Sequence, residues 1–591
     1  MPDQSRKIVH LQSSLGESRA AVVSLTGREA VNDLFTFQVS VIADNDPIMP
    51  EEILGEEVML TMRYSDVERV VHGVVASISE TEAAGDNVFE YSLEIVPKLW
   101  LLSLSAHTRI FEEMTVPDIV KSVVADGCGM AVEVVTSASY RKREMCVQFE
   151  ESDLQFVQRL LQDEGIAFYF KQTPGSATLV LSDSVSGFPN CQPSSYPYSE
   201  RDNAAWKTGV SSFRRAGRIA TGEIVSRDFT EYAPSNPLEV KNKSRAKAKL
   251  RPGIRQVYGQ HDFDNPGART LPRGACADQA KVWLESLESD ADFFHGESAA
   301  PSLIPGHKIS LSDAPVCSDG DKQYLLLEVF HSASEGLDSE SVYSNWFKCA
   351  PSSNTVSFLP SFTLERPRVW GVQTATVVDV RNPGDPESHG EVKIRFHWEP
   401  NQFSCWARVG QLYAGNRWGG YFIPDVGQEV LVEFINGDPD RPVVVGAVYN
   451  RDNTLPPYTK TQSGIRTRSS DFNELRFDDE DGDEEVYFQA GRDHNFLIKN
   501  DETGDIGNDE TLTVGNNRTI DVGNDHSLSA GANISLEARS SITLKVGGSE
   551  IKMDPTGVTI TGSMIKIKGN ATTEVSAGAV VTVKGGLVKI N

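Results

Sequence analysis

The chain has 591 residues and a formal net charge of -27 at pH 7, with 39% hydrophobic and 24% charged residues. One hydrophobic core rarely serves so long a chain, so we expect about three to five domains. The acidic balance, without a visible basic stripe, excludes nucleic-acid binding through phosphate neutralisation. A trimer would carry three times this charge, which disfavours adhesion to an anionic bilayer.

Targeting signals are missing from the sequence as it stands. No stretch approaches the roughly 18 apolar residues that span a bilayer, so we expect no stable membrane insertion. Residues 1–7 are not followed by the apolar core of a signal peptide, which predicts a protein made and kept in the cytoplasm. If it leaves the cell, it leaves without a cleaved signal. The seven cysteines are scattered and form no CxxC, which favours reduced thiols.

Residues 1–364 are predicted to be mixed β with some helix. Polar and apolar residues alternate well over 35–39 and 90–95, as in half-buried strands. Residues 170–360 carry the fewest recognisable signals.

One helix is clearly signalled over residues 153–164. Ser152 is a plausible N-cap, and Gln155 three residues later completes a capping box. Gly165 follows as the C-cap, and residues 166–170 then read as a strand. The apolar face of the helix is expected to consist of Leu154, Val157, Leu160 and Leu161.

Residues 365–455 contain short strands separated by turn signals such as Asn436-Gly437-Asp438-Pro439. The clearest strands are 376–378, 392–396, 430–434 and 443–445. Five or so short strands in so short a region favour a small barrel of OB type.

Residues 456–499 are expected to form a neck. Residues 500–591 differ from everything before them because their sequence repeats. Glycine-containing turns recur every eight residues, and no aromatic residue follows Phe496. The predicted repeat turns are Gly507, Gly515, Gly523 and Gly531. Alternating apolar residues follow the same step, and further on the phase shifts while the alternation persists. The predicted inward row is Ile506, Leu512, Val514, Ile520, Val522, Leu528, Ile534, Leu536, Ile542, Leu544, Val546, Ile551, Met553, Val558, Ile560, Ile565, Ile567, Val581, Val583, Val588 and Ile590.

The length of the repeat indicates how many chains build the structure. A single-chain β-helix with three walls uses about 18 residues per coil, so eight residues cannot make one alone. Three chains that each give one strand and turn supply about 24 residues, which is enough. An isolated chain would leave its apolar row in water. The repeat therefore favours an interwoven trimer, with a monomeric solenoid as the alternative.

Several motifs in chain order resemble the VgrG spike family of bacterial type VI secretion and its relatives in contractile phage tails. In the first region they are Gln148-Phe149-Glu150-Glu151-Ser152-Asp153-Leu154, Arg159-Leu160-Leu161 and Glu164-Gly165-Ile166. In the barrel they are Arg395-Phe396-His397-Trp398, Trp418-Gly419, Ile423-Pro424, Gly427-Gln428-Glu429-Val430 and Asn436-Gly437-Asp438-Pro439-Asp440-Arg441-Pro442. The neck carries Thr461-Gln462-Ser463-Gly464-Ile465 and Phe472-Asn473-Glu474-Leu475-Arg476-Phe477. Asp425-Val426 departs from the family, which often has a basic residue there.

The resemblance implies a mainly β fold with some α structure, in four parts. These are a phage-tail-hub-like domain (1–364), an OB-fold barrel (365–455), a neck (456–499) and a triple-stranded β-helix of an intertwined homotrimer (500–591). It implies a membrane-puncturing spike with the Hcp tube at the hub end, a PAAR protein at the other end, and contacts to baseplate proteins. Because the sequence stops at Asn591, we expect an effector, with or without an adaptor, to be carried non-covalently.

Motifs for chemistry are weak, and we predict no catalytic residue, no metal site and no cofactor. The acidic run 478–485 fails as a calcium loop because Phe477 and Phe488 fall where carboxylates belong. Residues 295–298 contain a His and a Ser but no GxSxG turn. His494 and His526 could each become three potential metal ligands on a threefold axis. Lysines near the end, which are Lys566, Lys568, Lys584 and Lys589, read as a solvated face or a contact for an acidic cap.

The sequence is also compatible with three other functions. A prophage tail spike would share the fold and differ in genetic neighbourhood. A cell-wall glycan hydrolase would need paired carboxylates within residues 170–360. A trimeric adhesin is disfavoured by the missing signal peptide. Some phage relatives carry a lysozyme domain between barrel and helix, but about 45 residues are too few for one.

Overall fold

The described chain forms two compact units. A computed structural model describes residues 7–16, 19–44, 46–64, 67–81, 88–173, 175–199, 208–229, 234–235, 238–245, 252–258, 273–312, 323–335, 341–361, 363–385 and 388–590. We call Met1–Arg466 with Glu474–Tyr487 the head unit, and Thr467–Asn473 with Phe488–Asn591 the repeat unit.

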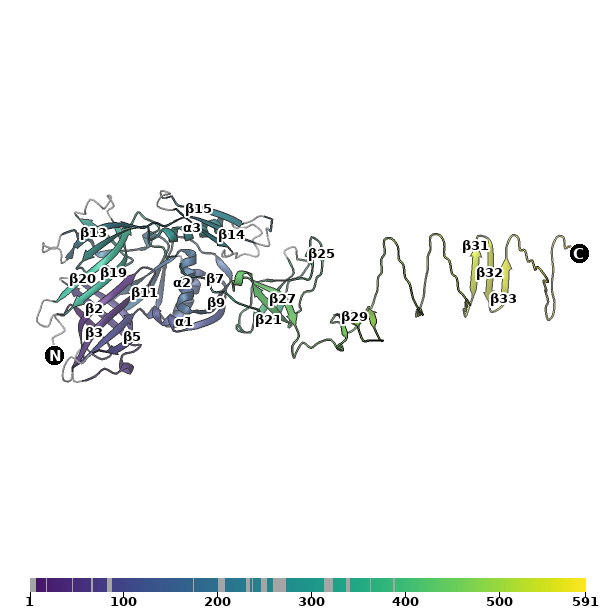
Figure 1. Ribbon diagram of the computed structural model, residues 1–591, viewed down its shortest axis with the longest axis horizontal. Coiled ribbons are helices and arrows are strands. Elements are labelled where there is room, and N and C mark those ends of the chain that lie inside the picture. The colour runs from purple at the N-terminus through teal and green to yellow at the C-terminus, as the bar shows by residue number, and fades with distance from the viewer. Residues whose placement is uncertain are drawn as a thin grey trace. The chain divides into compact units, whose positions relative to one another are not determined.

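The largest element of the head unit is a 12-stranded sheet. Its main path runs β1-β4-β5-β6-β3-β2-β19-β20-β17-β13, and β18 joins β12 to β19. The strands are β1 (Val9–Gln12), β2 (Ala20–Ala30), β3 (Thr36–Asp44), β4 (Glu57–Tyr64), β5 (Val67–Glu80), β6 (Val88–Val96), β12 (Asn190–Pro197), β13 (Val210–Gly217), β17 (Asp292–Ser298), β18 (Lys308–Ser312), β19 (Tyr324–Ser334) and β20 (Val342–Pro351). The path pairs residues 24–30 with residues 328–334, so the two ends of the region 1–364 lie side by side in one sheet (Figure 1).

The strands predicted at 35–39 and 90–95 are confirmed as parts of β3 and β6. Phe37, Val39 and Val41 are fully buried while Gln38 between them is exposed, as expected for a strand with one face on the core. β3 and β6 pair antiparallel, with Phe37 opposite Ile95.

Two capped helices, α1 (Val116–Cys128) and α2 (Asp153–Glu164), share one buried hydrophobic cluster with strands of this sheet. The capping box of α2 forms as predicted, because Gln155 N donates to Ser152 Oγ at 3.1 Å and Ser152 N donates to Gln155 Oε1 at 3.2 Å. Gly165 ends α2 in the left-handed region at φ 68°. The predicted apolar face is buried at Leu154, Val157, Leu160 and Leu161.

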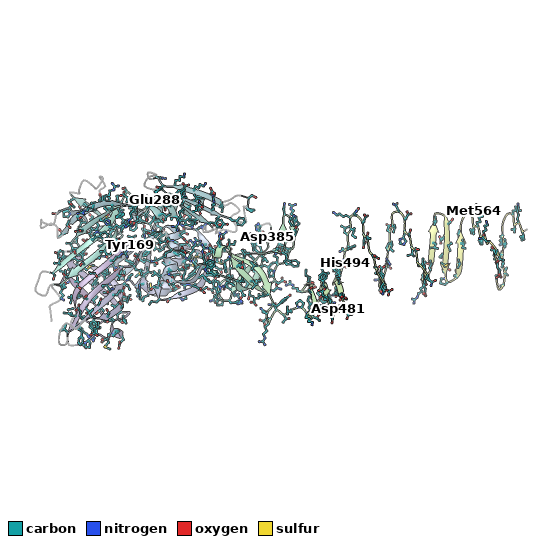
Figure 2. All side chains as sticks on the ribbon, viewed as in Figure 1. Tyr169, Glu288, Asp385, Asp481, His494 and Met564 are labelled. Carbon is teal, nitrogen blue, oxygen red and sulfur yellow. The ribbon has the colours of Figure 1, made fainter. Side chains whose placement is uncertain are left out.

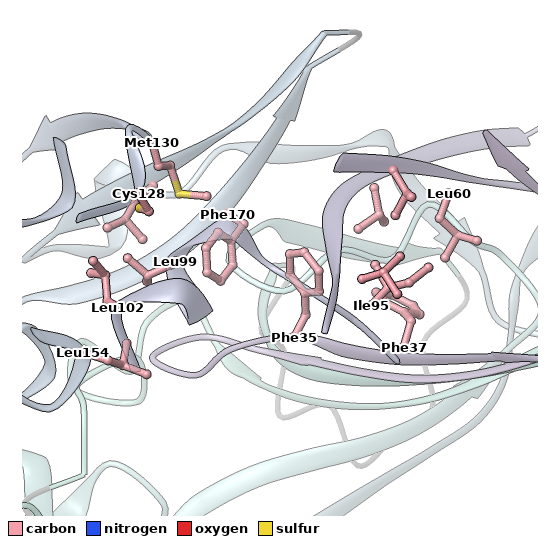
Figure 3. Close-up of a cluster of buried hydrophobic side chains, with 14 of the residues drawn as sticks. Phe35, Phe37, Leu60, Ile95, Leu99, Leu102, Cys128, Met130, Leu154 and Phe170 are labelled. Carbon is pink, nitrogen blue, oxygen red and sulfur yellow. The ribbon is translucent and has the colours of Figure 1, made fainter. Parts of the chain in front are cut away.

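The main core lies between these helices and the sheet. Figure 3 shows Leu99, Leu102 and Leu154 on the helical side, with Phe35 and Phe37 from the sheet region. The rings of Phe35 and Phe170 meet edge to face at 5.3 Å between centroids.

Smaller sheets complete the hub-like region. β7 (Ala106–Thr115) pairs with β9 (Lys142–Ser152), and β8 (Ala131–Val135), β10 (Ala167–Thr173) and β11 (Ser176–Ser182) form a second sheet. β14 (Thr221–Asp228), β15 (Leu238–Lys243) and β16 (Gly253–Tyr258) form a third, beside α3 (Arg273–Glu288). In the described part of the chain, no helix is both long and apolar enough to cross a bilayer.

The predicted small barrel is confirmed as a closed barrel in the order β21-β22-β23-β27-β26. Its strands are β21 (Gln373–Val380), β22 (Glu391–Phe396), β23 (Ala407–Val409), β26 (Glu429–Phe434) and β27 (Pro442–Val448), and a small hairpin, β24 (Ala414–Gly415) with β25 (Trp418–Gly419), stands apart. Closure leaves no free sheet edge, so the barrel's strands satisfy their backbones within one chain.

Beyond the barrel the strands become short and sparse. β28 (Gln462–Arg466), β29 (Glu474–Asp478) and β30 (Glu485–Gln489) form a sheet, and the acidic run 478–485 is the turn between β29 and β30. The repeat unit then contains β31 (Ile542–Val546), β32 (Ser549–Asp554) and β33 (Gly557–Thr561). Figure 1 draws these three as neighbouring arrows in a segment otherwise traced without strands.

Candidate functional site

The repeat unit bends at a constant step of eight residues. The chain bends at residues 491, 499, 507, 515, 523, 531 and 539, turns at 547 and 555, and bends again at 563, 571, 579 and 587. Glycine is absent at Arg539-Ser540 and Pro555-Thr556, yet the step continues through both. The eight-residue period therefore does not depend on glycine, which is only one way to make the bend.

The predicted inward row lies exposed along this zigzag in the single chain. Twenty of its 21 side chains are exposed, from 36% at Met553 to 91% at Ile590, and Ile542 is half-buried. The same residue types are fully buried in the barrel, as at Val430 and Val432. Burying one such side chain stabilises a fold by about 1.5–3 kcal/mol, so leaving the whole row in water is strongly unfavourable. Figure 2 shows these side chains as sticks along an open trace.

The backbone of this segment is also without partners in its own chain. Between residues 492 and 541, all of which the structure describes, no backbone group bonds to another backbone group. Extended strands with two open edges are templates for further strands. Apolar surface and open edges together require pairing with other chains, although the inward direction of each side chain stays a prediction.

The four predicted turn glycines have no close neighbours in the single chain. A Cβ at Gly507, Gly515, Gly523 or Gly531 would meet nothing within 4 Å. None of them takes a positive φ, so backbone conformation does not require glycine there. The role of the four glycines as repeat turns stays a prediction.

The residues weighed for chemistry lie apart from one another. His295 and Ser298 are three residues apart on β17, so they point to opposite faces of the sheet. His295 stacks on Trp346 with 4.8 Å between centroids, and Ser298 Oγ donates to Gly209 O at 2.7 Å. No nucleophile–base pair forms between them.

His494 and His526, the two histidines considered as metal ligands on a threefold axis, lie beside aromatic rings or exposed to solvent. His494 lies 4.9 Å from the Phe488 ring and 6.1 Å from the Phe496 ring, and His526 is exposed. Among the residues that the structure describes, no three His, Cys, Asp or Glu side chains gather closely enough to hold a metal ion. The absence of a metal at His494 and His526 in a trimer stays a prediction.

A junction joins the hub-like region to the barrel, and sequence analysis missed it. Ile110, Met145 and Val147 belong to the barrel's own hydrophobic core. Phe149, from the hub motif, meets Trp398, from the barrel motif, edge to face at 6.2 Å. The two family motifs are therefore neighbours in space, and the shared core places both regions in one compact unit.

Hydrogen bonds reinforce this junction. Asp440 Oδ1 accepts from Val147 N at 2.6 Å, and Glu112 Oε1 accepts from Phe403 N at 2.7 Å. Each carboxylate satisfies a backbone group that the shared core would otherwise leave without a partner.

Asp153 anchors the hub motif itself. Its buried Oδ1 accepts from Gln148 Nε2 at 2.7 Å, His107 Nδ1 at 2.9 Å and Arg109 Nη2 at 3.1 Å. Arg159 pairs with Glu151 at 2.6 Å and also donates to Val147 O at 3.3 Å. The polar residues of the motif thus fix β9 against β7 and α2, which is a positioning role.

Glu144 on β9 is a titratable group at this junction. Burial raises its pKa from 4.5 to about 7, although nearby Lys393 on β22 opposes the shift. Glu113 raises the pKa further, while Arg381 and a hydrogen bond from the Trp406 backbone lower it.

A buried charged network braces the large sheet. Arg69 pairs with Glu29, and Glu29 Oε2 lies 2.9 Å from His331 Nε2. His331 Nδ1 bonds to the Tyr343 hydroxyl at 2.6 Å. Burial alone would raise the pKa of Glu29, but attraction to Arg69 and His331 outweighs it and holds the pKa at about 2. The network joins β2, β5, β19 and β20 and lies away from the surface.

Three family models match the chain in succession. The phage tail baseplate hub model covers residues 28–337, and the type VI secretion and phage-baseplate injector OB domain covers 373–449. The bacteriophage T4 gp5 C-terminal trimerisation domain covers 463–575, which includes most of the exposed row. Hub, injector barrel and trimerisation domain in one chain define the spike class of contractile injection proteins.

Curated relatives narrow the class. The Pseudomonas aeruginosa type VI secretion system spike protein VgrG1c is 31% identical over 537 residues, which span 85% of this chain and 71% of that protein. VgrG1a of the same organism is 30% identical over 85% of this chain and 80% of its own length. This chain therefore belongs to the VgrG family of type VI secretion system spike proteins. Its fold class and its role in effector delivery agree with the sequence predictions.

Solved structures show the same fold. The E. coli c3393 protein, a type VI secretion component similar to the T4 tail proteins gp27 and gp5, matches with a TM-score of 0.53 at 20% identity over 74% of this chain and 99% of that one. A lidless PdpA-VgrG complex matches with a TM-score of 0.52 at 8% identity over 82% of this chain and 98% of that one.

Proposed function

We propose that this chain forms a homotrimeric spike whose hub seats on an Hcp tube and baseplate, with a PAAR protein at the C-terminal end. The observation that carries the proposal is the exposed apolar row on unpaired, regularly bent backbone. Three interwoven copies bury the row and pair the backbone at once. The resulting dry, hydrogen-bonded shaft transmits the force of sheath contraction.

The proposal includes cargo that docks without a covalent link, directly or through an adaptor. It is supported by the PdpA-VgrG complexes, which share the fold. A Vibrio cholerae relative named actin cross-linking toxin VgrG1 is 31% identical, but this chain spans 44% of that protein. Mass spectrometry of spike complexes purified from cells should find an effector or cap with the chain, and a complex without either would contradict docking.

The proposal assigns no catalysis, metal or cofactor to this chain. The relatives VgrG1c and VgrG1a are named as spike proteins, and His295 and Ser298 occupy opposite sheet faces. No nucleic acid and no stable membrane insertion are part of the mechanism. The protein is proposed to wait in the cytoplasm and to leave the cell with the fired tube, without a signal peptide. A peptidoglycan zymogram that showed clearing would contradict the non-enzymatic assignment.

The domain limits 1–364, 365–455, 456–499 and 500–591 stay part of the proposal. The decisive experiment is the native mass of the full chain and of a chain ending before residue 500. Three copies of 64.8 kDa give about 194 kDa, which is the mass we expect for the full chain. The shorter chain should lose the trimer if the repeat unit is the main lock. A monomeric full chain would overturn the spike proposal.

A further inference from the structure

Residues 542–561 differ from the rest of the repeat unit because they pair with themselves. β31 and β32 are antiparallel, with Leu544 opposite Ile551, and β32 and β33 are antiparallel, with Ile551 opposite Ile560. The turn between β31 and β32 is Gly547-Gly548, a two-residue hairpin with Gly547 in the left-handed region at φ 56°. This pairing contrasts with residues 492–541, where no backbone bond forms within the chain.

The three-stranded sheet has one apolar face and one polar face. The register places six side chains on the first face: Ile542, Leu544, Ile551, Met553, Val558 and Ile560. The other face carries Thr543, Lys545, Glu550, Lys552, Thr559 and Thr561. In the single chain, the apolar face is still open, with Leu544 55% and Ile560 50% exposed. One chain therefore completes the backbone pairing but leaves the apolar face to be covered.

The apolar residues also switch between even and odd residue numbers where the chain begins to pair with itself. In an extended chain, residues two apart share a face. Apolar residues on one face therefore all have even numbers or all have odd numbers (one parity) unless a turn changes the register. A two-residue hairpin reverses parity, because partners such as Val546 and Ser549 differ by three. From 506 to 546 every predicted inward residue is even: Ile506, Leu512, Val514, Ile520, Val522, Leu528, Ile534, Leu536, Ile542, Leu544 and Val546.

After Gly547-Gly548 the parity alternates with each turn. The apolar residues are odd in β32 (Ile551, Met553) and even again in β33 (Val558, Ile560). Eight-residue bends without a parity change fit a chain whose neighbours come from other copies. Parity changes at successive turns fit a chain that folds back on itself.

We infer that the trimeric shaft changes construction at Gly547, from an interwoven section to a section in which each chain alone builds one wall. The inference rests on the proposed trimer and names two further copies of this chain as the cover of the apolar face. Three sheets with apolar faces inward make a closed three-walled section. The gp5 trimerisation domain spans 463–575, so the sheet lies inside the trimerising segment and continues its interface.

Cross-strand disulfides test the construction directly. Lys545 and Glu550 are Cα partners on the polar face, and they flank the two-residue turn at the second pair, which lacks backbone bonds and suits a disulfide. In K545C/E550C both thiols fall in one tryptic peptide, 540–552. No native cysteine follows Cys405, so the new pair is isolated in the repeat unit. A disulfide within a chain gives a looped peptide, while one between chains gives a peptide dimer.

We expect oxidised full-length K545C/E550C of trimeric native mass to yield mostly the looped peptide and to run as a single chain on a denaturing, non-reducing gel. T513C/R518C is the matched control, because these residues flank the Gly515-Asn516 bend at the same distances. It should give no looped peptide, since that bend is not a hairpin within the chain. A looped peptide from T513C/R518C as well would contradict the proposed change in construction.

Peptide dimers or free thiols in trimeric K545C/E550C would overturn the inference and leave the spike proposal standing. A monomeric native mass of the unmodified chain would overturn both. If K545C/E550C does not assemble, T543C/K552C probes the next pair without backbone bonds and keeps the Lys545–Glu550 pair. Because Lys545 stays in that variant and trypsin separates the two thiols, the denaturing, non-reducing gel decides: a single chain supports the inference, and cross-linked chains overturn it.

Discussion

Head unit and repeat unit use the same apolar residue types with opposite results. In the barrel, Ala375, Ile394 and Val444 are fully buried, and the sheet closes within one chain. In the repeat unit, Leu512, Leu528 and Ile565 are each more than half exposed. Alternation of apolar and polar residues thus predicts strands in both units. It does not say whether the covering surface belongs to the same chain.

The difference teaches that one chain can hold a self-sufficient fold and a fold that exists only in an assembly. Unfolding of the head unit should not depend on protein concentration, whereas the structure of the repeat unit should. Each variant below therefore separates effects on native mass from effects on the head unit.

The largest effect is expected from a charge on the predicted inward row. Val522→Asp would bury three carboxylates near one axis, at a cost on the order of several kcal/mol each. We expect loss of the trimer by native mass, with the thermal unfolding of the head unit unchanged. Asp521→Ala, its neighbour on the other face, should leave the native mass as it is. A trimer that survives Val522→Asp would show that Val522 does not point inward.

The second largest effect is expected from the buried charged network of Arg69, Glu29 and His331 in the head unit. Arg69→Met leaves Glu29 and His331 buried without their cation, so we expect about 3–5 kcal/mol of lost stability in denaturant unfolding. The native mass at moderate temperature should not change. Arg63→Met, which removes an ion pair to Glu68 whose side chains are 45% and 52% exposed, should cost less than about 1 kcal/mol. Equal effects of the two variants would contradict the bracing role.

A pH effect is expected at the hub–barrel junction. Burial raises the pKa of Glu144 to about 7 in the folded chain, above the ordinary 4.5 of the unfolded one. The folded state then holds the extra proton between these values, so this group's stabilisation is present at low pH and is lost as pH rises through 7. Glu144→Gln should remove a pH-dependent part on the order of 3 kcal/mol from the free energy of unfolding. An unchanged pH profile would rule out this assignment.

The smallest effect is expected at the N-cap of α2, which is a local sequence signal. Ser152→Ala removes the N-cap of α2 and should lower the stability of the head unit by about 1 kcal/mol in denaturant unfolding. Ser122→Ala, in the interior of α1, is the control and should change stability by less than about 0.5 kcal/mol. If both behave alike, the capping box contributes nothing specific.

Local signals explain which predictions succeeded. The helix over 153–164 was predictable residue by residue, because Ser152, Gln155 and Gly165 act on backbone groups a few residues away. The barrel strands were predictable because alternation and turns are also local. The contact of Phe149 with Trp398 was not, because about 250 residues separate them and no local pattern encodes a partner.

The sequence by itself determined the eight-residue period, the capped helix, the succession of family motifs and a repeat too short for a coil of one chain. These follow from side-chain alternation, capping chemistry and the minimum size of a coil, which are properties of short segments. Only the tertiary structure decided that hub and barrel share one core, that Glu29, Arg69 and His331 meet, and that residues 542–561 pair within the chain. Those facts depend on which distant surfaces meet, and that depends on the packing of the whole chain.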